Sequence, residues 1–328
     1  MPGAKVNGKE PRMTSRYKTE PAMRRRAWAR NLISAVASLM TAVSLANTVR
    51  ASDLDEAAKG YKYLRCERHD AVYIARFYNP PTNLLNGAMV DEIRDLLKQV
   101  ENDKQTRVLV FTGGLPNYFI QHFDVAEIKK LADAVAVEPT IASESELKPI
   151  HQAFLEIEGL SKPVIAAING EAQGGGLELA LSCDFRIISS TGVLGFPEVN
   201  AGFVPGAGGT VRLPRLIGIP RAKEIIMLGQ PIDAKTAERW GLVTKAVPLD
   251  QLMPETLKLA QQLASLPPAA VSAAKKLINT SGEMPMQDAL KLEQTTFWGL
   301  LNTDDARRII DYVVTNGEKK AAQPEKNQ

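Results

Sequence analysis

Residues 165–213 read IAAINGEAQGGGLELALSCDFRIISSTGVLGFPEVNAGFVPGAGGTVRL. The apolar run at 164–168 has the length and branching of a buried strand, and Asn169-Gly170 predicts a turn after it. Three consecutive glycines follow at 174–176, and the apolar segment 177–181 predicts a helix that begins at them. We therefore expect a strand, a glycine turn and a buried helix at the centre of the fold.

The glycine turn is suited to binding a developing negative charge. A backbone without side chains can approach a ligand closely, and the first turn of a helix carries unpaired N–H groups and partial positive charge. Glu178 lies in this first helical turn, and Glu198 follows a short extended segment that Pro197 ends. A second glycine cluster at 206–209 opens the next segment. Two carboxylates beside a glycine-lined oxyanion site indicate acid/base chemistry next to a carbonyl group.

Three segments together resemble the enoyl-CoA hydratase/isomerase (crotonase) superfamily: GGGLELALSCDFRI, FPEVNAGFVPGAGGTVRL and AKEIIMLGQPIDAKTAERWGLV. The similarity extends from about residue 63 to about residue 305. It implies an α/β fold, a spiral of repeated strand–strand–helix units, and a C-terminal helical region through which subunits form homotrimers, often paired into hexamers. The sequence shows no internal repeat from which this spiral could be derived.

The resemblance also assigns the chemistry. It implies that the backbone N–H groups of Phe123 and Gly175 bind the thioester oxygen, and that Glu178 and Glu198 are the two carboxylates of the hydratases, which share one water. Many isomerases keep only the carboxylate that matches Glu198. Taken singly, Glu198 fits a solvated loop acid and Glu178 an acid favoured by a helix N-terminus, whereas their joint spacing favours catalysis.

By the same resemblance, the substrate is an acyl-CoA thioester, with no cofactor other than this coenzyme A and no metal. The backbone around Leu84, Leu85 and Asn86 is expected to contact the adenine, and Lys129 lies near the position of a phosphate-binding lysine. The remaining predicted substrate-binding residues are Asp124, Gly174 and Gly206.

The sequence departs from the family pattern in two places. Residues 120–122 are Ile-Gln-His where small residues are usual, and this bulk affects the size of the acyl pocket. We expect His122 to line the pocket or the surface, because the sequence supplies it with no catalytic partner. The C-terminal RRIIDYVVTNGEKK lacks the usual acid-glycine step, so Tyr312 and Lys319 or Lys320 are the residues that can replace the family's aromatic and lysine.

Composition limits the remaining function classes. The chain of 328 residues is 45% hydrophobic and 23% charged, and its net charge of +3 owes much to the N-terminal segment, so charge does not predict a nucleic-acid partner. Cys66 and Cys183 belong to no metal-spaced cluster, and Cys183 is predicted to be a buried thiol. The three histidines are scattered, which makes a metal site improbable.

The N-terminal segment 1–56 is predicted to be disordered and targeting-like. Residues 1–22 are polar, whereas in 23–51 four arginines precede an apolar stretch at 32–46 and small residues before a possible cleavage after Ala51. The pattern fits an export signal, an organellar presequence or upstream sequence without a role. The apolar run is too short for a comfortable membrane span. The enzyme interpretation predicts a cytoplasmic protein instead, because coenzyme A thioesters are intracellular metabolites.

The pattern after residue 57 predicts a layered α/β core at 57–252, a helical region at 253–316 and a disordered tail at 317–328. Strands are expected at 71–77 and 108–112 around a helix at 87–101, with a loop at 138–146. We interpret the chain as a hydratase of 2-enoyl-CoA thioesters. The alternatives are an isomerase, another acyl-CoA enzyme of the family, or a catalytically silent partner, against which the two glutamates and the glycines argue.

Overall fold

The computed structural model describes residues 53–143 and 146–321. The segment 1–22, the signal-like segment 23–51 and the end of the predicted tail lie outside these residues. The chain divides into two units, of which the larger, Thr48–Ala306, holds the α/β body. The described part of the smaller unit consists of the residues of helix α13 (Asp304–Ala321) from Arg307 onward.

The body alternates strands and helices as far as residue 247 and then continues with helices. The strands are β1 (Leu64–His69), β2 (Val72–Phe77), β3 (Val108–Gly113), β4 (Asn117–Ile120), β5 (Val164–Ile168), β6 (Gly170–Gln173), β7 (Phe185–Ser189), β8 (Val193–Gly195), β9 (Ile232–Asp233) and β10 (Lys245–Val247). The helices are α2 (Asp53–Ala58), α3 (Gly87–Asn102), α4 (Val125–Val137), α5 (Pro149–Gly159), α6 (Gly175–Ser182), α7 (Gly209–Ile217), α8 (Ile219–Leu228), α9 (Ala234–Trp240), α10 (Leu249–Ala264), α11 (Pro268–Ser281) and α12 (Met286–Leu301). Two 3-10 helices, η1 (Pro139–Ser143) and η2 (Glu198–Ala201), complete the set.

The strands form two sheets. Six of the described strands pair in the order β1-β2-β3-β5-β7-β10, and four pair in the order β4-β6-β8-β9. The successive pairs β3–β4, β5–β6 and β7–β8 each place their first strand in the larger sheet and their second in the smaller one, and helices follow each pair. Neighbours from successive pairs run parallel. This repetition is the predicted spiral of strand–strand–helix units.

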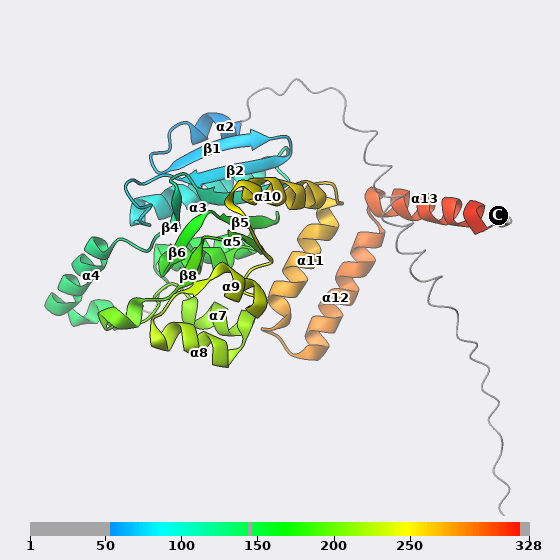
Figure 1. The fold of residues 1–328 in the computed structure, drawn as a ribbon. Helices are drawn as coiled ribbons and strands as arrows, with labels where there is room; N and C mark the ends of the chain where they lie inside the picture. The colour runs from blue at the N-terminus through cyan, green and yellow to red at the C-terminus, as the bar shows by residue number, and fades with distance from the viewer. Residues whose placement is uncertain (1–52, 144–145, 322–328) are drawn as a thin grey trace, which may run out of the picture. The chain divides into compact units, whose positions relative to one another are not determined.

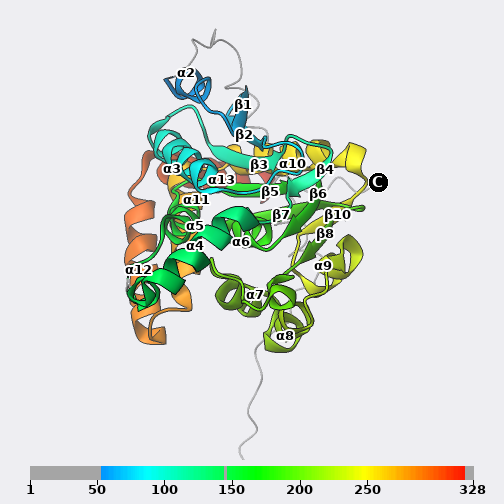
Figure 2. The ribbon, with the colours of Figure 1, turned by 90° about the vertical axis from the view of Figure 1, so that its left-hand side faces the viewer.

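Alternation along the strands builds a core on each face of the larger sheet. On β2, Tyr73 and Phe77 face the main core, whereas Val72 and Ile74 face a second cluster that includes Leu252 of α10. Successive side chains of a strand point to opposite faces, so one strand serves both clusters. Figure 1 shows α10 along one side of the sheet, and Figure 2 shows α3, α5 and α6 on the other.

Several helix predictions are confirmed. Helix α3 buries its predicted apolar face, whose members are Met89, Ile93, Leu96, Leu97 and Val100. Asp233 caps α9 as expected, since its side chain accepts a hydrogen bond from Thr236 N at 2.7 Å, and Gly241 ends that helix with a φ of 78°. Cys183 is buried, and burial raises the pKa of its thiol to about 12. It is therefore the inert thiol that the sequence predicted.

Other elements differ from the expectation. Strands β1 and β6 were not expected, and part of the predicted loop at 138–146 is the helix η1. The domain boundaries predicted at 57, 252 and 316 fall inside or beside α2, α10 and α13, so residues 53–56 and 317–321 are helical. Ala58 of α2 packs into the main core. Helix α2 thus contributes to the core directly after the predicted start of the core at residue 57.

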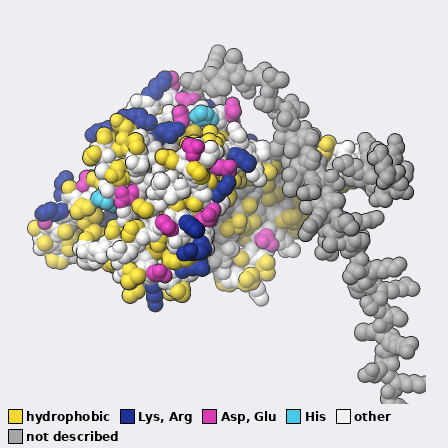
Figure 3. All heavy atoms as spheres, in the orientation of Figure 1, with side chains coloured by type: hydrophobic (Ala, Val, Ile, Leu, Met, Phe, Trp, Pro, Cys, Tyr) yellow, Lys and Arg dark blue, Asp and Glu magenta, His cyan; other side chains and the backbone are white. Residues whose placement is uncertain are grey.

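The surface is mixed in charge. On the face shown in Figure 3, Lys and Arg side chains are interspersed with Asp and Glu side chains. None of the described helices is both long and apolar enough to cross a bilayer. Charge alone therefore marks no extended basic surface on the face in view.

Candidate active site

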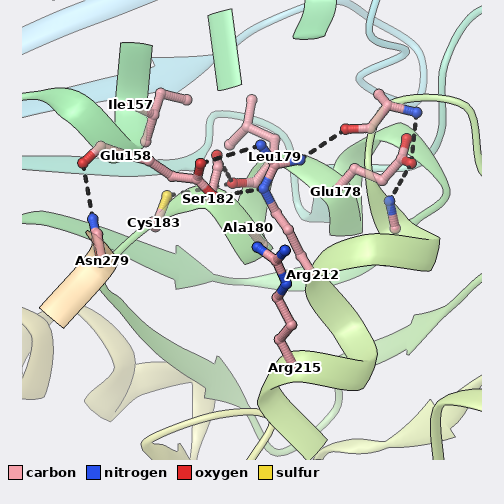
Figure 4. Close-up of polar contacts among 12 residues, drawn as sticks. Ile157, Glu158, Glu178, Leu179, Ala180, Ser182, Cys183, Arg212, Arg215 and Asn279 are labelled. Atoms are coloured by element: carbon pink, nitrogen blue, oxygen red, sulfur yellow. Dashed lines mark hydrogen bonds and ion pairs between the residues drawn. The ribbon is translucent and has the colours of Figure 1, made fainter. Parts of the chain in front are cut away.

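Glu178 is fixed by the second glycine cluster. It lies in the first turn of α6 with only 2% of its surface exposed. Its Oε1 accepts hydrogen bonds from the backbone N–H of Ala207 at 2.7 Å and of Gly209 at 2.8 Å (Figure 4). Burial raises the pKa of the Glu178 carboxyl, whereas the two N–H groups and the charge of Arg212 act in the opposite direction. The carboxylate therefore has a defined orientation in a buried position.

Glu198 is held much less firmly. It begins the short helix η2 and is 9% exposed. Its Oε2 is buried and has no hydrogen-bond partner among the residues that the structure describes. Burial raises the pKa of Glu198 to about 7, and the negative charge of Glu178 contributes in the same direction. Both protonation states of Glu198 are therefore accessible near neutral pH, which is the range a proton donor and acceptor needs.

The glycine turn leaves space for this carboxylate. Gly174 has a φ of 49°, and a Cβ built on it would lie 2.8 Å from Oε1 of Glu198. Gly176 is constrained by packing instead, because its Cβ would lie 2.1 Å from the carbonyl oxygen of Ile120. A side chain at either position would collide with a neighbouring segment, so the glycines allow α6 to begin against the site.

A parallel bridge joins Phe123 to Leu85, and Phe123 also lies beside Gly175. The N–H of Leu85 donates to the His122 carbonyl oxygen at 2.9 Å, and the N–H of Asp124 donates to the Leu85 carbonyl oxygen at 2.7 Å. In this pattern the N–H of Phe123 points away from Leu85. A Cβ at Gly175 would lie 3.6 Å from the nitrogen of Phe123, and the N–H of Gly175 belongs to the first turn of α6. Two backbone donors therefore meet at one place.

A cavity of about 520 Å³ joins these groups. Six predicted site residues line it: Phe123, Gly174, Gly175, Glu178, Glu198 and Gly206. Most of the remaining wall is apolar, with side chains of α4 such as Ile128 and Leu131, and with Phe203 after η2. An apolar pocket with a few convergent polar groups is the usual form of a small-molecule site.

His122 also lines this cavity, in agreement with the expectation for it. Its Nδ1 lies 2.8 Å from the carbonyl oxygen of Phe123. A carbonyl oxygen only accepts, so Nδ1 is the donor in this hydrogen bond. His151 of α5 is a second cavity-lining histidine, which the sequence analysis did not single out.

The other predicted substrate-binding and CoA-binding residues do not line the cavity, and in the described structure they have local contacts. Asn86 caps α3 by accepting from Met89 N, and Asp124 caps α4 by accepting from Ala126 N. The carbonyl oxygen of Leu84 accepts a hydrogen bond from the side-chain Nδ2 of Asn79, and Leu85 forms the bridge to Phe123. Lys129 pairs with Asp133 at 2.6 Å on the surface. Their contact with coenzyme A stays a prediction.

Sequence reasoning missed the groups that hold Glu178. The amides of Ala207 and Gly209 belong to the PGAGG cluster, and that cluster was the available signal. Arg212 gave no signal, because one arginine on an amphipathic helix is ordinary. Among the described residues no group of three or more His, Cys, Asp or Glu side chains is placed to hold a metal ion. The absence of a metal from the reaction stays a prediction.

Known structures share this architecture. An enoyl-CoA hydratase from Bacillus anthracis superposes with a TM-score of 0.70 at 32% identity, covering 78% of this chain and 97% of that chain. The short-chain-enoyl-CoA hydratase of Clostridium acetobutylicum is 35% identical over 74% of this chain and 90% of its own length. The crotonyl-CoA hydratase of Syntrophomonas wolfei is 35% identical over 75% of this chain and 93% of its own length.

The fold and the paired carboxylates thus define a crotonase-like protein. Residues 67–323 match the family described as enoyl-CoA hydratase/isomerase, and the chain belongs to this family. The family and the fold class predicted from the sequence are therefore confirmed.

Proposed function

We propose that this chain adds water across the 2,3 double bond of a 2-enoyl-CoA thioester. The observation that carries the proposal is the single cavity in which two buried carboxylates, Glu178 and Glu198, lie beside the backbone of Phe123 and Gly175. The relatives named as hydratases support it, because they match most of this chain.

The two glutamates have distinct roles in the proposed step. Glu178, which keeps two amide N–H groups and a nearby arginine charge, accepts a proton from water as the water oxygen bonds to the β carbon. The π electrons move toward the α carbon and the thioester oxygen. Glu198, with a pKa of about 7, gives its proton to the α carbon. A proton then passes from Glu178 to Glu198 through water, which restores both groups.

The oxyanion site makes this addition possible. Negative charge that develops on the thioester oxygen meets the N–H groups of Phe123 and Gly175, whose backbones are already in place. Losing one such donor typically costs about 3 kcal/mol of barrier. Only main-chain groups are required, so the bulky residues at 120–123 are compatible with this role.

An isomerase is the second candidate. It needs one carboxylate that moves a proton between the α and γ carbons, and Glu198 has the pKa for that task. The firmly held Glu178 would then have no chemical role, and for this reason we favour hydration. A catalytically silent protein would need neither buried carboxylate.

Turnover of a panel of thioesters tests the proposal. Trans-2-enoyl-CoA substrates from four to sixteen carbons are followed by the loss of conjugated absorbance, and 3-enoyl-CoA substrates by its appearance. Hydration of at least one 2-enoyl-CoA supports the proposal. Isomerisation without hydration supports the second candidate, and no turnover of either class supports the silent alternative.

We also propose that the protein is an intracellular homotrimer or hexamer. Coenzyme A thioesters are intracellular metabolites, whereas an intact export signal at 23–51 would place the chain elsewhere. Helix α12 exposes Phe297 and Trp298 and buries none of its side chains in this chain. A second copy that covers this face would explain the exposure. Sedimentation as a monomer at micromolar concentration would overturn the assembly, and N-terminal sequencing of the cell-derived protein tests the location.

A further inference from the structure

The backbone turn at 207–209, which donates hydrogen bonds to Glu178, is itself hydrogen-bonded by Arg212. Ala207 donates its N–H to Glu178, and its carbonyl oxygen accepts a hydrogen bond from Nη1 of Arg212 at 2.9 Å. Arg212 lies on α7, which begins directly after this turn. A Cβ at Gly208, whose φ is 109°, would lie 2.0 Å from Nη1 of Arg212. Glycine at position 208 therefore leaves room for the hydrogen bond between the Arg212 guanidinium and the carbonyl oxygen of Ala207.

Glu158 fixes the other side of the guanidinium. Its Oε1 lies 2.6 Å from Nε of Arg212, and its Oε2 accepts from Nη2 at 3.3 Å. The Arg212 side chain is 15% exposed and the Glu158 side chain 32%, so the pair is partly shielded from water. A bidentate pair of this kind fixes the direction of the arginine as well as its position.

Helix α5, which carries Glu158, is anchored to α11. Asn279 donates to the carbonyl oxygen of Glu158 at 3.1 Å, and Lys275 donates to the carbonyl oxygen of Ile157 at 3.1 Å. Figure 4 shows Asn279, Glu158, Arg212 and Glu178 in one view. The hydrogen-bonded path therefore runs from α11 through α5 and α7 to the carboxylate of Glu178.

We propose that Arg212, oriented by Glu158, is a positioning residue that fixes the turn at 207–209 and thereby the carboxylate of Glu178. This inference rests on the proposed role of Glu178 as the acceptor of the water proton. Because a water proton can be transferred only over a short, aligned path, a loosened turn lowers the rate without removing any reacting group. Arg212 touches the turn and Glu158, and it acts through them.

The charge of Arg212 gives the inference a second readout. Arg212 lowers the pKa of Glu178 against the effect of burial, so its removal is expected to raise that pKa. The other charged or titratable groups that share the cavity wall with Glu178 are Glu198 on η2, Lys148 and His151 at the start of α5, and His122. None of them changes in an Arg212 variant, which isolates the effect of this charge.

The chain offers a matched control for this pair. Arg94 of α3 forms an equivalent bidentate contact with Glu156, also on α5, with Nη2–Oε1 at 2.7 Å. The Arg94 side chain is 26% exposed and the Glu156 side chain 34%. The Arg94–Glu156 pair lines no part of the cavity in the described structure. We therefore expect its loss to affect the stability of α5 and to leave the turn at 207–209 in place.

The experiment compares Arg212→Met, Arg212→Lys and Glu158→Gln with Arg94→Met and Glu156→Gln in the full-length protein. Arg212→Met is expected to lower kcat about 10- to 100-fold with little change in KM, and to move the acid limb of the kcat profile to higher pH. Arg212→Lys keeps the charge, so it should leave this limb in place while losing part of kcat. The control variants should keep kcat within about twofold at comparable losses of Tm.

Equal kcat values for the Arg212 and Arg94 variants would overturn the inference while the hydratase function stands. A wild-type protein that hydrates no enoyl-CoA would overturn the function instead. In that case, a ¹³C NMR titration of Cδ-labelled glutamate still decides the inference, with Glu178→Gln used to assign the resonance. An unchanged Glu178 titration in Arg212→Met would then overturn it. If Arg212→Met does not fold, the losses of kcat in Arg212→Lys and Glu158→Gln decide the outcome.

Discussion

The two walls of the cavity present the same side-chain type and hold it in opposite ways. On the wall formed by α6 and the turn before α7, Glu178 accepts two backbone hydrogen bonds and lies near Arg212. On the wall formed by η2, Glu198 has an Oε2 without a partner among the described residues, and its pKa is about 7.

This difference separates the roles of the two carboxylates. Burial disfavours the charge on both. Two backbone N–H groups and the charge of Arg212 oppose this effect at Glu178, whereas at Glu198 only its own backbone N–H does so. Glu178 is therefore suited to remain oriented toward a water, whereas Glu198 is suited to exchange a proton near neutral pH. The environment of each glutamate, rather than the residue type, therefore sets its role.

Removing either carboxylate is expected to have the largest effect. Glu178→Gln and Glu198→Gln should each lower hydration about 10²- to 10⁴-fold, because each removes one proton transfer. Glutamine keeps the volume of the side chain, so folding and thioester binding should change little. The double variant should be scarcely slower than either single variant, since groups that act as a unit are not additive. Initial rates with the best 2-enoyl-CoA measure all three.

Exposed Glu293 on α12 provides the control for this series, and Glu293→Gln should keep the wild-type rate. An isomerase would respond differently, since Glu198→Gln would abolish its activity and Glu178→Gln would leave most of it. Full hydration activity in both single variants would contradict the assignment of the pair.

A side chain at Gly174 is expected to displace the loosely held carboxylate. The Cβ of Gly174→Ala would lie 2.8 Å from Oε1 of Glu198, which can move only by leaving its position in the cavity. We expect kcat to fall about tenfold or more, since small displacements of reacting groups are costly. Gly241→Ala is the matched control: Gly241 has a φ of 78° and nothing within 4 Å of its Cβ. A similar loss of kcat in both variants would show that backbone strain, and not the collision, is responsible.

The sequence predicted the parts of this site that depend on local order. The strand at 164–168, the glycine turn and the start of α6 are adjacent along the chain, so Glu178 could be placed on the first turn of a helix. The residues themselves predicted two carboxylates beside a glycine-lined site, and the family resemblance assigned Glu178 and Glu198 to one shared water. The fold then shows that both side chains line one cavity. The family and fold class expected from that resemblance are confirmed.

The remaining features depend on contacts between distant segments. Strand β1 reads LRCERH, and its charged residues do not form the apolar pattern of a strand. It becomes recognisable only through its pairing with β2. Strand β6 reads GEAQ and has no apolar alternation that a sequence pattern could reveal. Likewise, the support of Glu178 by Ala207 and Arg212 joins α6, a turn and α7, and no local pattern encodes it.

The pH dependence of the rate should report the protonation of Glu198. Glu198 must be protonated to give its proton, so kcat/KM should fall about tenfold per pH unit above about 7. The negative charge of Glu178 raises the pKa of Glu198, so Glu178→Gln should move this limb to lower pH in the residual rate. A limb that stays in place in Glu178→Gln would contradict the coupling between the two groups.

The raised pKa of Glu198 also predicts how the stability of the protein depends on pH. The folded pKa of Glu198 is raised from 4.5 to about 7, so the neutral carboxyl contributes stability that is fully present below about 4.5 and is lost as the pH rises through about 7. Glu198→Gln cannot ionise. Its Tm relative to wild type should therefore be higher at pH 8 than at pH 4.5, as measured by thermal unfolding at both values.

The smallest expected effect concerns His122, which contacts the backbone of Phe123. Its protonated Nδ1 donates to the Phe123 carbonyl oxygen at 2.8 Å, in the same extended segment that presents the Phe123 N–H to the cavity. His122→Asn places an amide nitrogen near the position of Nδ1 and should keep kcat within about twofold. His122→Gln places its polar atoms one bond farther out and should lower kcat about three- to tenfold, since one neutral hydrogen bond is worth about 1 kcal/mol. Single-turnover rates of the two variants measure the difference. The reverse order, with His122→Gln faster, would show that Nε2 and not Nδ1 is the atom that matters, and would make His122 a residue that contacts the acyl group.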